Sequence, residues 1–162
     1  MERKILVPLD GSALSERAIE PAEKLAKAIG YEMIFFRVID TPLERSPEAE
    51  PEEERRVASA SIDKAITYLQ GIASRIEGQG IRTRIEVGDG YPHSAILALA
   101  DKEDVEFIIM STHGRTGLSR VLMGSVAEKV VYSTERPVML VKPEKISRTR
   151  SLEEKAILSA RS

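Results

Sequence analysis

The sequence contains no cysteine and no tryptophan, and these absences exclude several functions. Without cysteine there are no disulfides, no thiol catalysis and no cysteine-ligated metal sites. Aromatic residues make up only 4% of the 162 residues, which leaves few rings for stacking nucleic-acid bases. The formal net charge of -2 also provides no basic surface for nucleic acid.

Long apolar runs are also missing. No segment approaches the roughly 20 apolar residues that cross a bilayer. The opening MERKILVPLDGS has too short an apolar core for a signal peptide. We therefore expect a cytoplasmic protein that binds neither membrane nor nucleic acid. Its 42% apolar and 31% charged residues are typical of one soluble globular domain.

Apolar segments of strand type alternate strictly with amphipathic segments of helix type. We expect strands over residues 4–10, 32–40, 81–90, 105–111 and 136–143, and helices over 11–30, 57–80, 91–104 and 125–135. The central strands are apolar without alternation, so both of their faces are expected to be buried. The pattern predicts an α/β fold, a three-layer α/β/α sandwich around a five-stranded parallel sheet.

Several residues predict where the helices begin, bend and end. Ser12 is a candidate N-cap, Pro21 should kink the first helix, and Gly30 should end it. The acidic, proline-rich segment 41–56 is interpreted as a solvated loop that leads into the second helix. The apolar face of that helix is expected to consist of Ile62, Ile66, Leu69, Ala73 and Ile76.

The stretch STHGRTGLSRVLMGSVAEK follows the strand 105–111 and contains three glycines. It is either a long surface connection or a phosphate cradle, because glycines let backbone N–H groups approach an anion closely. In an open α/β sheet, ligands bind beyond the carboxyl ends of the strands, where this stretch falls. That position favours the cradle. Ser125 and Glu128 also match a capping box at the start of the next helix.

The spacing of Ser111, Gly114, Gly124 and Ser125 resembles the G-x2-G-x9-G-[ST] motif of nucleotide-binding universal stress proteins. Serine replaces the first glycine of that motif. The segments ILVPLDGS, FRVID and RPVMLVKP also resemble the family. The resemblance covers residues 1–143, and the tail 144–162, either a short helix or disordered, lies outside it. It implies a Rossmann-like sheet with strand order 3-2-1-4-5, similar to the adenine nucleotide alpha hydrolase-like folds.

The resemblance also implies a site for ATP or AMP. Val38 and Met110 would hold the adenine, Pro8 would line the pocket, and Asp10 would meet adenine or ribose. Ser111 and Gly114 would approach the ribose and the first phosphates, and Gly124, Ser125 and Val126 would bind the outer phosphates. Mg2+ or Mn2+ would be held through the phosphates. A homodimer would form through the edge strand Val138–Val141, whose bare apolar edge invites pairing.

Several alternatives remain open at the level of sequence. Asp10 is also typical of a turn or helix cap, and Arg115 and Arg120 are expected to face solvent. His93 and His113 are too few for a zinc site. The Walker and G-x-G-x-x-G motifs are absent.

Three functions compete. The first is a regulatory, stress-response nucleotide-binding protein with at most slow ATP hydrolysis. The second is a family member without nucleotide that acts as a dimeric interaction module. The third is an enzyme, a nucleotidyltransferase or an ATP pyrophosphatase. The sequence lacks the H-x-G-H and S-G-G-x-D-S strings typical of those two enzyme classes.

Overall fold

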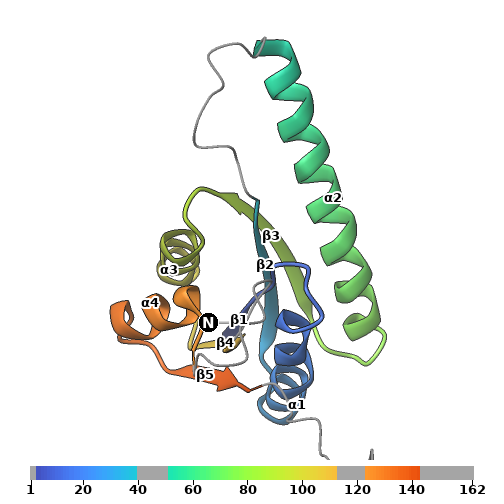
Figure 1. The fold of residues 1–162 in the computed structure, drawn as a ribbon. Helices are drawn as coiled ribbons and strands as arrows, with labels where there is room; N and C mark the ends of the chain where they lie inside the picture. Colours follow the sequence, from blue (N-terminus) through green and yellow to red (C-terminus); the bar gives the residue numbers. More distant parts are fainter. Residues whose placement is uncertain (1–2, 40–50, 113–122, 143–162) are drawn as a thin grey trace, which may run out of the picture.

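The computed structural model describes residues 3–39, 51–112 and 123–142 (Figure 1). The expected tail, 144–162, lies outside these ranges. The strands are β1 (Lys4–Pro8), β2 (Glu32–Ile39), β3 (Thr83–Asp89), β4 (Phe107–Ser111) and β5 (Val138–Val141). The helices are the 3-10 helix η1 (Ser15–Ala18) and the α-helices α1 (Ile19–Ile29), α2 (Pro51–Glu77), α3 (Pro92–Lys102) and α4 (Ser125–Ser133).

The five strands form one parallel sheet in the order β3-β2-β1-β4-β5, which confirms the predicted fold class and strand order. β1 and β4 are neighbours, paired from Ile5↔Phe107 to Leu6↔Ile108. β1 leads on to β2, and β4 leads on to β5 on the other side. The strand order therefore reverses between β1 and β4, which makes this pair the switch point of the sheet.

Helices cover both faces of the sheet, with α1 and α2 on one face and α3 and α4 on the other (Figure 1). Each face has its own apolar core, because successive strand residues point to opposite sides. Val7, Phe35 and Ile109 belong to the core on the α1 and α2 side. Leu6, Ile34 and Ile108 belong to the core on the α3 and α4 side.

The first helix begins differently from the prediction. Residues 15–18 form the 3-10 helix η1, and α1 starts only at Ile19, so Pro21 falls in the first turn of the α-helix. A proline is tolerated there because the first N–H groups of a helix have no partner within the helix. Gly30 ends α1 as predicted, in the left-handed conformation with φ 74° and ψ 30°.

The second helix is longer than predicted, because α2 starts at Pro51 inside the segment interpreted as a loop. Proline is favoured in the first turn of a helix, which is the signal that the loop interpretation overlooked. Leu69, Ala73 and Ile76 are buried as expected. Ile62 is 39% exposed, which corrects its predicted place in the core.

The exposure of Ile62 follows from the length of α2. The helix has 27 residues, about 40 Å at 1.5 Å per residue, and its first half projects beyond the sheet (Figure 1). Val57, in the same half, is 50% exposed.

No helix of the described residues is long and apolar enough to cross a membrane.

Candidate functional site

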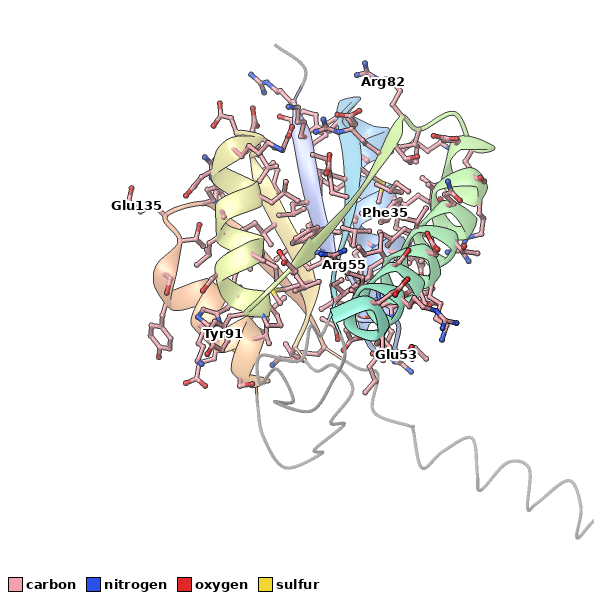
Figure 2. The ribbon with its side chains drawn as sticks, turned by 90° about the horizontal axis from the view of Figure 1, so that it is seen from above. Phe35, Glu53, Arg55, Arg82, Tyr91 and Glu135 are labelled. Atoms are coloured by element: carbon pink, nitrogen blue, oxygen red, sulfur yellow. The ribbon has the colours of Figure 1, made fainter. Side chains whose placement is uncertain are left out.

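The carboxyl ends of the strands lie at the same end of the molecule as Tyr91, just beyond β3, and the start of α2, marked by Glu53 (Figure 2). Arg82 and Glu135 mark the opposite end (Figure 2). The candidate site lies at the carboxyl end of β1 and β4, at the switch point. Its described parts come from the turn after β1, the ends of β2 and β4, and the start of α4.

The turn after β1 is built on Asp10 and two serines. The Asp10 Oδ1 accepts hydrogen bonds from the Ser12 N–H at 2.9 Å and from the Ser12 Oγ at 2.6 Å. The Ser12 Oγ in turn accepts a hydrogen bond from the Ser15 N–H at 3.1 Å. Ser12 is nevertheless not the predicted N-cap, because the N-cap residue is Leu14 for η1 and Ala18 for α1. The buried Ser15 Oγ donates to the Ser12 carbonyl at 2.8 Å. One oxygen of Asp10 therefore organises the turn, whatever else its carboxylate contacts.

The glycine-rich connection after β4 is closed at its base. The Gly124 N–H donates to the Thr112 carbonyl at 2.5 Å, and the Thr112 N–H donates to the Val141 carbonyl at 3.0 Å. These bonds hold the start of α4 against the end of β4. Ser111 and Thr112 are both buried, at 6% and 2% exposure. Thr112 and Gly124, the residues on either side of the connection, therefore lie next to each other.

The start of α4 corrects the predicted capping box. Gly124 is the N-cap residue, with φ -73° and ψ 153°, and Ser125 is the first residue of the helix. Gly124 has no side chain with which to cap the helix, and the Glu128 N–H bonds to the Gly124 carbonyl at 2.9 Å as an ordinary helical bond. The predicted capping box is wrong because the helix begins at Ser125, one residue earlier than a Ser125 N-cap requires. The first N–H groups of the helix, which carry partial positive charge, therefore receive no hydrogen bond from a side chain of the N-cap residue.

Three apolar residues of the predicted site share one face of the sheet. Met110 belongs to the core on the α3 and α4 side, and the partly buried Val38 packs against it. Pro8 lies two residues after Leu6 of the same core, so strand alternation turns it to that side as well. Val126, in the first turn of α4, packs against this core too. The structure thus brings Pro8, Val38, Met110 and Val126 to a single side of the strand ends.

Of the remaining predicted residues, the structure describes only His93. Gly114, Arg115, Arg120 and His113 lie outside the described residues. His93 lies in the first turn of α3 and is half-buried, with its Nε2 3.2 Å from the Ser94 Oγ. Among the described residues no group of three or more histidines, aspartates or glutamates is placed to hold a metal ion.

Sequence reasoning missed two residues near the turn, Arg37 and Tyr68. The guanidinium of Arg37 in β2 lies over the ring of Tyr68 in α2, with its Cζ 5.0 Å from the ring centroid. The Tyr68 hydroxyl donates a hydrogen bond of 2.9 Å to Glu16. A usable signal was present, because Arg37 interrupts the apolar run MIFFRVI of β2.

Known proteins resemble this chain over most of its length. The sequence model of the universal stress protein family matches residues 1–142. Universal stress protein MJ0531 of Methanocaldococcus jannaschii is 33% identical over 144 residues, which are 88% of this chain and 84% of that protein.

Solved structures have the same fold. The structure of protein MJ0577, from the same organism, has a TM-score of 0.78 and 32% identity, and the match covers 90% of this chain and 99% of that one. A universal stress protein family protein of Arabidopsis thaliana, solved with AMP bound, has a TM-score of 0.63. At 19% identity, with 88% of this chain and 92% of that one covered, it shows the likeness of the fold alone.

Proposed function

Because the chain belongs to the universal stress protein family, we propose that it is a cytoplasmic regulatory protein of the stress response that binds ATP or AMP. The observation that carries the proposal is the closed base of the glycine-rich connection. The bond from the Gly124 N–H to the Thr112 carbonyl keeps the start of α4, whose N-cap residue is a glycine, beside the strand ends of the switch point. Such a helix start favours an anion through its free N–H groups and its dipole.

The adenine would lie against the apolar side of the strand ends. The shared orientation of Pro8, Val38 and Met110 supports this assignment, because a flat apolar base needs apolar side chains on one side of the sheet. Asp10 would meet the adenine or the ribose. Its Oδ1 already accepts two hydrogen bonds from Ser12, so we assign Asp10 the role of shaping the turn as well.

The phosphates would lie along the connection and the start of α4. Ser111 and Gly114 would approach the ribose and the first phosphates, and Gly124, Ser125 and Val126 would bind the outer ones. The glycine at the N-cap of α4 fits this role, because Gly124 has no side chain that could take the place of a phosphate at the helix start. Ser111 is small and buried, so its replacement of a motif glycine should weaken binding rather than abolish it.

A divalent ion, Mg2+ or Mn2+, would accompany the triphosphate. The described residues offer no cluster of three metal-ligating side chains. The proposal therefore assigns the ion to phosphate oxygens. Such an ion would neutralise phosphate charge and polarise the terminal phosphate, which leaves slow hydrolysis as the most that we assign to the site.

A second function has its own support. β5 lies at the edge of the sheet and Met139 is 39% exposed, so a second copy of the chain can pair along this strand. We propose a homodimer through Val138–Val141, which acts either together with nucleotide binding or, if Ser111 disables the site, as the main function.

The test is nucleotide occupancy followed by titration. We would denature protein purified without added nucleotide, chromatograph the supernatant, and titrate ATP and AMP with Mg2+ by calorimetry. The proposal expects retained nucleotide or a micromolar Kd, lost in Gly124→Asp, because a carboxylate at the N-cap would occupy and repel the phosphate position. Lys129→Glu, an exposed change of charge further along α4, is the matched control and should still bind. No retained nucleotide and no heat from either compound would contradict the proposal.

A further inference from the structure

Arg37 lies behind the turn that follows β1. Its half-buried guanidinium is placed between the Tyr68 ring, 5.0 Å away, and the backbone of Gly11. A Cβ atom built on Gly11 would lie 3.1 Å from both Nη1 and Nη2 of Arg37. Gly11 also has φ +85°, a conformation that favours glycine. The arginine thus rests directly against the turn.

Tyr68, which contacts Arg37, is itself anchored to a neighbouring element. Its hydroxyl donates to Glu16 of η1 at 2.9 Å. Burial, reinforced by this bond, raises the pKa of Tyr68 above its ordinary value. Through these contacts β2, α2 and η1 meet around the turn.

The opposite side of the sheet carries the residues expected to touch adenine. Val38 follows Arg37 in β2, and the two side chains point to opposite faces. Val38 packs with Met110 on the α3 and α4 side, whereas Arg37 faces Tyr68 on the α2 side. Arg37 therefore contacts the site from behind, through the backbone of the turn.

We propose that Arg37 and Tyr68 are positioning residues that brace the Asp10–Gly11 turn in the shape that binds nucleotide. The affinity of the site then depends on the docking of α2, which carries Tyr68. This inference rests on the proposed function and adds to it two residues and one helix that make no contact with the ligand themselves.

The buried Nε of Arg37 provides a matched comparison. This atom has no hydrogen-bond partner among the described residues, and the same holds for the Nε of Arg84. Arg84 lies near the amino end of β3, at the far end of the sheet. Each arginine should stabilise the fold, but only Arg37 lies against the turn. Arg84→Gln is therefore the control for Arg37→Gln.

The first measurement compares ATP affinity with stability. Calorimetry with ATP and Mg2+ should show binding about tenfold weaker in Arg37→Gln and in Tyr68→Leu than in the wild type. Arg84→Gln should lower the Tm and leave the Kd unchanged. If Arg37→Gln lowers the Tm and binds ATP as the wild type does, its role is structural only and the inference is wrong.

The second measurement needs no nucleotide. The Ser12 N–H, bonded to Asp10 Oδ1, should exchange with solvent about tenfold faster in Arg37→Gln than in the wild type, because the turn opens more often. If the Ser12 N–H of Arg37→Gln exchanges at the wild-type rate, Arg37 does not brace the turn and the inference is wrong.

The two proposals fail in different ways. A wild-type protein that binds no ATP contradicts the proposed function and with it the claim about affinity. Normal binding by all of the variants contradicts only the inference about Arg37 and Tyr68.

Discussion

Gly88 in β3 lies so close to Phe36 in β2 that no side chain fits between them. A Cβ atom on Gly88 would lie 2.7 Å from the Phe36 Cζ, and Phe36 is only 4% exposed. The ring cannot move into solvent, so the strand or the core must shift. At the scale of single residues, the hydrogen atom that Gly88 carries in place of a methyl group allows β2 and β3 to pack this closely.

Gly88→Ala should therefore destabilise the protein by about 1–3 kcal/mol, the usual cost of overpacking a core. Urea unfolding followed by circular dichroism measures this change. Gly71→Ala is the control, because Gly71 lies exposed in α2 with nothing within 4 Å of its Cβ position. That substitution should stabilise the helix by about 0.5–1 kcal/mol. Equal stability of Gly88→Ala and the wild type would contradict the predicted clash.

Glu103 joins two strands to the end of α3 through charge. Its carboxylate accepts hydrogen bonds from Arg84 and, at 3.0 Å, from Lys4, and its side chain is 11% exposed. The bond from Arg84, followed by the bond from Lys4, lowers the pKa of Glu103 below its ordinary value. The folded state therefore binds fewer protons than the unfolded state in acid.

This sign gives a prediction for acid unfolding. The stability that Glu103 contributes is present at neutral pH, begins to fall near the ordinary glutamate pKa of about 4.3, and is lost as the pH drops through the lower folded value. Glu103→Gln should be less stable than the wild type at pH 7, and the difference should shrink in acid. Glu20→Gln, which removes an exposed pair with Lys24, should change little. A constant difference across pH would contradict the assignment.

At the scale of elements, α2 combines a packed half and a projecting half. Leu69 is fully buried against the sheet, whereas Ile62, two turns earlier, is 39% exposed. The same helical period runs through both residues, so the pattern alone assigns them the same environment. The length of the sheet, and not the helix, determines where burial ends.

Leu69→Ala should cost about 2–5 kcal/mol, because it leaves a cavity in the core. Ile62→Ala should cost less than about 1 kcal/mol, because little of its surface is removed from water and alanine favours the helix. Urea midpoints of the two variants test this pair. A loss at Ile62 as large as the loss at Leu69 would mean that the projecting half is covered in solution.

At the scale of the whole molecule, β5 leaves one side of the sheet open to another strand. The proposed dimer would cover this edge, and Met139 is its exposed apolar side chain. Met139→Lys should therefore convert a dimer into a monomer, as measured by sedimentation velocity, because lysine on an edge strand opposes pairing. Ile29→Lys, a similarly exposed residue at the end of α1, should leave the dimer intact. A dimer that survives Met139→Lys would contradict pairing through β5.

The sequence by itself determined the order and type of the elements and the fold class. Each of these depends on a local pattern, such as an apolar strand or the glycine that ends α1. Residues that are close together in the sequence are enough to form such a pattern. Strand order came from the resemblance to a family, not from periodicity. Element ends were predicted less well, as the starts of α1 and α2 show, because a serine or a proline fits more than one position of a helix start.

The tertiary structure alone decided which side chains meet. It turned Pro8, Val38 and Met110 to one side of the switch point and closed the connection after β4 with a backbone bond. It also set Arg37 against Gly11, although 26 positions separate them in the sequence. Such contacts depend on how strands pair and how far a helix extends past the sheet. No pattern within a single segment contains that information.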